Sequence, residues 1–363
     1  MTELLQQLIA IPSLSRDEKA VADFLEARLT AEGLAPHRCG NNLWCCHGEG
    51  PAILLDAHID TVKPVTGWTR DPFTPAVEDG RLYGLGSNDD GASVVALIAA
   101  YKQLIAKPQP YTLVLSLSAE EESSGREGLE ISLAEIEAAC GPVACGVFGE
   151  PTSLEMVVAE KGLMVLDCAV KGVAGHAARN TGVNAIYKAL PAIEWFRTKQ
   201  FDKVSDQLGS VKMTVTQINA GTQHNVIPDI CTFVVDVRSN GLYTNEDLLE
   251  LILAEAPCEV VARSTRLHGS AIAADHPLVA RGRAHGLLVQ FFQLRQEDGQ
   301  LVLPQQSHFR QHRHMGHRSH DVPRREHHIQ LPVLSDRERV DLRRIIESFR
   351  PDFHGCKPSN SFT

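Results

Sequence analysis

The sequence lacks long apolar runs and any excess of positive charge. No stretch of about 18 consecutive apolar residues, the length of a membrane-spanning helix, occurs among its 363 residues. The first twenty residues contain no basic leader followed by an apolar segment, so we expect no secretory signal. The formal net charge is -10 at pH 7, whereas nucleic-acid binding needs a basic face. We expect a cytoplasmic protein that binds a small molecule, and neither a membrane nor a nucleic acid.

The sequence also lacks a disulfide framework. Its nine cysteines form no CxxC pair and have no regular spacing. An odd number of irregularly spaced cysteines is typical of reduced thiols in a cytoplasmic protein. The length favours two domains, because single hydrophobic cores stop growing near this size.

Short apolar segments alternate with helical patterns over the first 150 residues. Ser15 and Glu18 have the spacing of a capping box, and Gly33 ends the helix that follows. Predicted strands lie near 52–55, 111–118 and 143–148, and predicted helices near 92–105 and 129–139. This alternation indicates an α/β fold with a mostly parallel sheet covered on both faces.

The pattern changes after about Ala159. Strand-like segments near 163–170, 211–218 and 230–237 are separated by helical segments near 185–196 and 246–255. We predict that 160–268 form an inserted α+β lid or dimerisation domain. Residues 1–159 and 269–363 would then form the larger domain.

The sequence from about Ala280 to 335 is atypical. It has little periodicity, and eight of the 16 histidines lie at position 308 or beyond. One hypothesis is that this part of the gene has been read in a shifted frame. The alternative is a surface tract that binds metals, as histidine-rich segments do. A helical pattern returns at 336–349.

Acidic and imidazole side chains follow the predicted strands, where open α/β sheets place their sites. His58 and Asp60 follow the first of these strands, and period 2 points both to one side. One can bind a metal while the other orients it. A hydrogen-bonded turn is the alternative for this pair.

Three further segments contribute carboxylates. Asp89 lies in a glycine-rich turn before a helix, where a helix cap is the alternative. Three consecutive glutamates, Glu120 to Glu122, follow the strand at 111–118, and adjacent like charges favour a nearby cation over a solvated surface. Glu150 follows the strand at 143–148. Together with the imidazole, these carboxylates suit zinc or a similar divalent metal.

At these residues the sequence resembles the M20 family of metallopeptidases, and within it the branch of acetylornithine deacetylase and succinyl-diaminopimelate desuccinylase. The match runs from the N-terminus to about Pro277. The resemblance implies a catalytic domain that binds two divalent metals, zinc or else cobalt. It also implies an inserted lid domain that forms a homodimer.

The resemblance implies a role for each matching residue. His58 and Glu150 would bind one metal, Glu122 the second, and Asp89 both. Asp60 would orient His58. Glu121 would be the general base, which takes a proton from the attacking water and delivers it to the leaving amine.

Four residues outside this cluster complete the predicted site. His176, in the segment GVAGHAARNTGVNAI, would reach the partner's site as an oxyanion donor, with a turn histidine as the alternative. Asn219 and Arg238 resemble substrate-contacting positions, and an arginine fork suits a carboxylate; an exposed strand end is the alternative for Arg238. The family needs one more metal-binding histidine. His320 is the nearest match, although chance is the better explanation in a segment with so many histidines.

The predicted reaction is metal-dependent hydrolysis of the amide bond of a small N-acyl amino acid. N-acetylornithine, and hence a deacetylase of arginine biosynthesis, is the first expectation, and its succinyl relative is the next. A dipeptidase or carboxypeptidase of the same family, and a catalytically impaired homologue without the last metal ligand, remain as alternatives.

Overall fold

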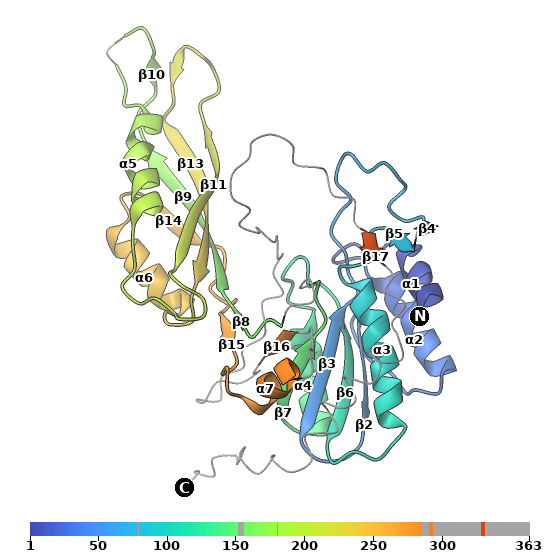
Figure 1. Ribbon diagram of the computed structural model, residues 1–363. Coiled ribbons are helices and arrows are strands. Elements are labelled where there is room, and N and C mark those ends of the chain that lie inside the picture. The colour runs from blue at the N-terminus through green and yellow to red at the C-terminus, as the bar shows by residue number, and fades with distance from the viewer. Residues whose placement is uncertain (79, 152–155, 180, 285–289, 293–327, 331–363) are drawn as a thin grey trace. The chain divides into compact units, whose positions relative to one another are not determined.

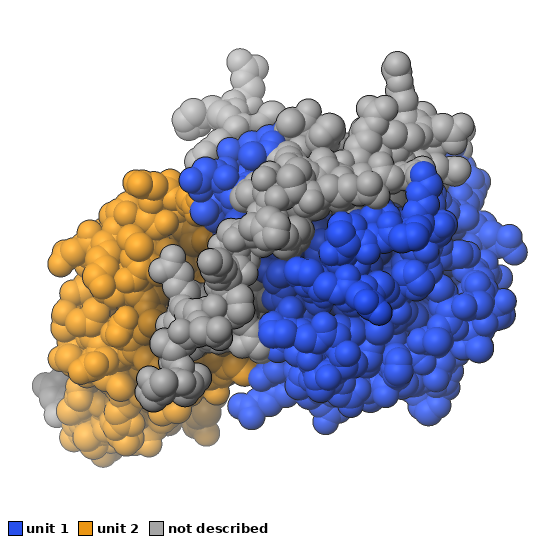
Figure 2. Space-filling model, turned by 90° about the horizontal axis from the view of Figure 1, so that it is seen from below, with its two compact units in different colours: residues 1–158, 272–294, 306–363 blue, residues 159–271, 295–305 orange. Residues whose placement is uncertain are grey.

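A computed structural model describes residues 1–78, 80–151, 156–179, 181–284, 290–292 and 328–330. The chain divides into two compact units, which Figure 2 distinguishes by colour. Unit 1 contains Met1–Val158 and the described residues from Ile272 onward, and unit 2 contains Ala159–Ala271.

Unit 1 is built on a six-stranded sheet in the order β1-β2-β6-β3-β7-β16. The strands are β1 (His37–Cys39), β2 (Asn42–His47), β3 (Ala52–His58), β6 (Thr112–Ser118), β7 (Val143–Phe148) and β16 (Gln290–Phe292). The centre, β6-β3-β7, is parallel, and the strands outside it pair antiparallel. A smaller sheet has the order β17-β5-β4 and contains β4 (Ala76–Glu78), β5 (Arg81–Tyr83) and β17 (His328–Gln330). The predicted α/β class is confirmed.

Helices cover this sheet, and the central strands β3 and β6 are buried along their whole length. The helices of unit 1 are α1 (Thr2–Ile9), α2 (Lys19–Ala31), α3 (Gly91–Ile105), α4 (Leu129–Cys140) and α7 (Pro277–Ala284). Alternate residues of β3, namely Ile53, Leu55 and Ala57, share one hydrophobic core with α1, α2 and α3. Helix α3 packs against β3 and β6, and α4 packs against β2 and β6 (Figure 1).

The start of α2 differs from the prediction. The helix begins at Lys19 with Glu18 as its N-cap, and no side chain caps it. The Ser15 hydroxyl instead donates to the Ser123 hydroxyl at 2.9 Å. The predicted capping box is therefore wrong, because both side chains bind a distant loop. The predicted end is confirmed by Gly33, whose φ is +81°.

Unit 2 is a four-stranded antiparallel sheet in the order β11-β13-β9-β14, with two helices. The elements are β9 (Gly162–Lys171), α5 (Ala185–Thr198), β11 (Lys212–Ala220), β13 (Ile230–Ser239), α6 (Asn245–Glu255) and β14 (Glu259–Ala262). Two short pairs accompany them, namely β10 (Gly175–His176) with β12 (Val226–Ile227), and β8 (Ala159–Glu160) with β15 (Ser270–Ala271). Its own core centres on Phe196 and Phe233, whose rings meet edge to face at 5.9 Å.

The helices and strands predicted up to residue 255 all occur, within a few residues of the expected bounds. Among the described residues, no helix is long and apolar enough to cross a membrane. Eight of the nine cysteines lie in the described part of the chain, and none of these eight forms a disulfide bond. His320, the predicted helix at 336–349 and most of the atypical segment lie outside the described residues.

Candidate metal centre

The site lies where three neighbouring parallel strands end. His58 is the last residue of β3 and pairs in register with Ser118, the last residue of β6. On the other side of β3, Asp56 pairs with Phe148, the last residue of β7. Parallel strands end at the same edge of a sheet, so the residues that follow β3, β6 and β7 meet there.

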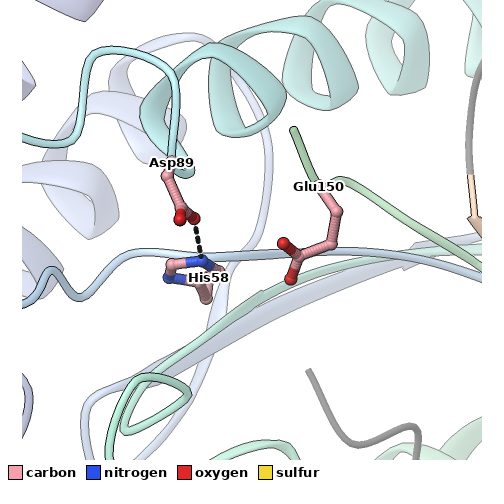
Figure 3. Close-up of side chains that lie close together, drawn as sticks. All are labelled: His58, Asp89 and Glu150. Carbon is pink, nitrogen blue, oxygen red and sulfur yellow. Dashed lines mark hydrogen bonds and ion pairs between the residues drawn. The ribbon is translucent and has the colours of Figure 1, made fainter. Parts of the chain in front are cut away.

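His58 is the centre of the cluster and is 1% exposed. Its Nδ1 lies 3.0 Å from the main-chain oxygen of Asp60, which can only accept, so Nδ1 carries the proton. Its Nε2 lies 3.0 Å from Asp89 Oδ1 and 3.7 Å from Glu121 Oε2. Figure 3 shows Asp89 and Glu150 directed toward the His58 ring from two different segments. The Nε2 atom therefore faces the carboxylates.

Asp60 connects His58 to the glutamates. Its Oδ1 accepts from the Glu121 amide and its Oδ2 from the Glu122 amide, each at 3.0 Å. Its Oδ1 also lies 3.4 Å from His58 Nδ1. Burial by itself would raise the pKa of Asp60, but the hydrogen bond and charge of His58 and the Glu122 amide outweigh burial and lower it. Asp60 is held as a carboxylate.

The loop before α3 brings Asp89 to the site. The buried Asp90 carboxylate accepts from the His58 amide at 3.3 Å, which fixes the loop against β3. Burial raises the pKa of Asp90 well above its usual value. On the facing segment, a Cβ at Gly149 would lie 2.2 Å from Ser93 Cβ. Only glycine lets the chain pass α3 so closely just before Glu150.

The ligand atoms form two groups around His58. One group is His58, Asp89 and Glu150, and the other is His58, Glu121 and Glu122. Within each group the ligand atoms lie within 4.8 Å of one another. One imidazole and four carboxylates are a donor set that suits divalent metals such as zinc.

The charges of the cluster oppose one another in a buried space. Burial raises the pKa of Glu121 well above its usual value, and the charges of Glu150 and Glu122 add to this, although His58 opposes it. Burial and the charge of Asp89 raise the pKa of Glu122 to about 7. Burial by itself would lower the pKa of His58, but the charge of Glu121 and the hydrogen bonds to Asp60 and Asp89 together outweigh burial and raise the pKa. Bound cations would relieve this repulsion, so the residues fit a metal centre.

Three predicted site residues lie in unit 2, and the structure places them within that unit. His176 is exposed, and its Nδ1 accepts from the Ala178 amide at 3.2 Å. Neutral His176 consequently carries its proton on Nε2. Arg238 donates to Asp236 through Nε at 2.8 Å and Nη2 at 3.0 Å, so its fork is occupied. Asn219 is exposed on β11, opposite Thr232.

Two residues at the base of the site were not among the predicted ones. Asn42 accepts from the Ala119 amide at 2.8 Å, and Glu18 accepts from the Glu120 amide at 3.2 Å. Both side chains are fully buried. No spacing in the sequence indicated these contacts, because Glu18 lies about a hundred residues before the glutamate run and the capping-box pattern already gave it a local explanation.

Comparison with known proteins identifies the family of this chain. Residues 158–258 match the family model of the peptidase dimerisation domain. Succinyl-diaminopimelate desuccinylase from Stenotrophomonas maltophilia is 34% identical over 255 residues, which cover 66% of this chain and 68% of that protein. The chain belongs to the M20 family and is by class a metal-dependent amidohydrolase.

Solved structures share the fold. An M20 metallo-carboxypeptidase from Sulfolobus solfataricus superposes with a TM-score of 0.62 at 15% identity, covering 78% of this chain and 82% of that one. A dinuclear metal-binding M20 peptidase from Bacillus subtilis gives a TM-score of 0.57 at 16% identity, covering 78% of each chain. At these identities the likeness concerns the fold.

Proposed function

We propose that this chain hydrolyses the amide bond of a small N-acyl amino acid with two zinc ions, in the cytoplasm and as a homodimer. The observation that carries the proposal is the pair of ligand groups around His58, the second of which contains Glu121 with its side chain only 5% exposed. The name of the desuccinylase relative supports an acylated amino acid as substrate. The match to the dimerisation domain supports the homodimer.

The residues divide into ligands and a base. His58, Asp89 and Glu150 would hold one metal, and Glu122 would hold the second, with Asp89 shared. When bound, the two cations supply Lewis-acid polarisation of the acyl carbonyl and make water more acidic. The main-chain oxygen of Asp60 keeps a proton on His58 Nδ1, and the Nε2 atom of the ring then faces the carboxylates.

Glu121 is the proposed general base. Its side chain is 5% exposed and its Oε2 lies 3.7 Å from His58 Nε2, so a carboxylate stands at the cluster where it can take up a proton. It takes a proton from the water whose oxygen attacks the acyl carbon. As the bond between the acyl carbon and nitrogen breaks, Glu121 gives that proton to the leaving amine.

His176, Asn219 and Arg238 are proposed to contact the substrate. His176 donates through Nε2 to the developing oxyanion of the partner's site, because its Nδ1 is already an acceptor. Arg238 would release the Asp236 carboxylate and bind the carboxylate of the substrate instead. His320 is proposed as the remaining metal ligand.

The proposal is tested by metal content and substrate choice. The purified chain is loaded with zinc, freed of weakly held metal, and its zinc is counted by elemental mass spectrometry. Hydrolysis is measured on N-succinyl-diaminopimelate, N-acetylornithine and an unmodified dipeptide. We expect two zinc ions per chain and turnover of an N-acyl amino acid, abolished by Glu121→Gln with the zinc retained.

Each other result has a meaning. Turnover of the dipeptide alone would replace the deacylase by a peptidase. Fewer than two metals without any turnover would identify a catalytically impaired homologue. Preference for the acetyl substrate over the succinyl one would favour arginine biosynthesis as its place, which was the first expectation from the sequence.

A further inference from the structure

Four consecutive main-chain amides next to the metal centre each donate to a buried side chain. They belong to Ala119, Glu120, Glu121 and Glu122. The first donates to Asn42 Oδ1 at 2.8 Å, the second to Glu18 Oε1 at 3.2 Å, and the last two to the oxygens of Asp60 at 3.0 Å. The acceptors come from three separate parts of the chain.

Glu18 and Asn42 are themselves anchored. Asn42 Nδ2 donates to the main-chain oxygens of Cys39 at 3.0 Å and Glu127 at 2.7 Å. Asn41 Nδ2 donates to Glu18 Oε2 at 3.1 Å. Glu18, Asn42 and Asp60 are each at most 1% exposed, so water does not compete for these acceptors. Asn42 thereby holds both ends of residues 119–127, which we call the carboxylate loop.

The carboxylate loop does not follow ordinary backbone preferences. Glu120 has a φ of +55°, a region that non-glycine residues rarely enter and keep only where the surrounding structure holds them there. A Cβ at Gly125 would lie 1.7 Å from Glu120 Oε2, so the loop also closes tightly on itself. The acceptors outside the loop, Asn42, Glu18 and Asp60, therefore hold the loop in a conformation that its own backbone preferences do not favour.

We propose that Glu18 and Asn42 are positioning residues for the metal centre, which set the direction of the Glu121 and Glu122 side chains by fixing the two amides before them. The inference rests on the proposed function, because it assigns these glutamates to metal and proton chemistry. Loss of either acceptor leaves the amide that donated to it without that partner, which is unfavourable away from water. The loop then relaxes, and the carboxylates of Glu121 and Glu122 leave the His58 group.

A merely structural role would lower stability without affecting the site. Asn245 is the matched control, since it is also fully buried and its Nδ2 donates to the main-chain oxygens of Leu163, Thr265 and Leu267. It lies in unit 2, so Asn245→Ala removes equivalent bonds away from the carboxylate loop. Glu18→Gln is the conservative variant, because its amide oxygen can still accept from the Glu120 amide, although its amide nitrogen cannot accept from Asn41.

The experiment compares Glu18→Ala and Asn42→Ala, made separately in the full chain, with these controls. Residue-resolved amide hydrogen exchange is measured on metal-free protein, and zinc affinity is measured by competition with a chelator. In both alanine variants we expect faster exchange at Glu121 and Glu122, whose own acceptor Asp60 is unchanged, and zinc affinity lower by about tenfold or more. Glu18→Gln and Asn245→Ala should keep the zinc affinity within about twofold of the original chain, a factor well below the effect of lost supporting contacts.

If only one of the two alanine variants folds, that variant alone tests the proposal, because the expected result is the same for both. Faster exchange confined to the amide that lost its acceptor would overturn the proposal, as would unchanged zinc affinity. If the original chain itself binds no zinc, the proposed function fails. The exchange measurement then still decides whether Glu18 and Asn42 fix the amides of Glu121 and Glu122.

Discussion

Replacing Glu122 by glutamine tests the electrostatics of the metal-free cluster. Burial and the charge of Asp89 raise the pKa of Glu122 from its ordinary 4.5 to about 7. The unfolded chain keeps the ordinary value, so the folded protein binds more protons between these two pH values. Stability then falls as the pH rises through this window, and the full cost is present above pH 7.

The magnitude follows from the difference in pKa. A difference of about 2.5 between these two values, at about 1.4 kcal/mol per unit, corresponds to about 3 kcal/mol. At pH 8 the metal-free Glu122→Gln protein should be more stable by up to this amount, because glutamine cannot ionise and can still accept from the Val62 amide. Near pH 4.5 the two proteins should differ little.

The assay is urea unfolding of metal-free protein at the two pH values. Trp44 is buried in β2 of unit 1, and a Trp195→Phe background removes the signal of α5. Glu49→Gln, an exposed glutamate of the same unit, is the control and should change nothing. A Glu122→Gln protein that is less stable than the original chain at pH 8, or that differs from it by the same amount at both pH values, would refute this view of the cluster.

Three further predictions follow from the structure. Asp60→Asn should lower zinc affinity by about 10–100-fold in a chelator competition, because it weakens the hold on His58; an unchanged affinity would exclude that role. His176→Ala should lower kcat by about 10²–10³ with little change in KM, and a rise in KM alone would indicate ground-state binding instead. Phe233→Ala should destabilise unit 2 by about 3–5 kcal/mol in calorimetry while leaving zinc affinity unchanged; a loss of zinc would show that the two units depend on each other.

Much of the cluster was predictable because its geometry follows from strand ends. His58 ends β3, Glu121 and Glu122 follow β6 within four residues, and Glu150 follows β7 within two. Parallel pairing of β3 with β6 and β7 brings these residues together. Asp89 was found from its turn before α3. The distances between these residues confirm that they meet, while their individual roles stay predictions.

The contacts that long-range packing decides were not predictable from spacing. Ser15 and Glu18 satisfy the local pattern of a helix cap, yet both side chains bind the carboxylate loop about a hundred residues away. Arg238 has the chemistry to bind a substrate carboxylate, but Asp236, on the same face of β13, already occupies it. In each case the side chain binds another group of suitable chemistry instead of the partner that the sequence pattern suggests.

The order of the ligands along the chain has a consequence for synthesis. Glu18, Asn42 and Asp60 all precede the carboxylate loop, and Glu150, the last proposed ligand among the described residues, precedes the first residue of unit 2 at Ala159. On the ribosome, the acceptors have therefore emerged before the amides that donate to them. The four described residues proposed as metal ligands also emerge before nearly all of residues 158–258, which match the dimerisation domain, so the described part of the proposed metal centre is synthesised first.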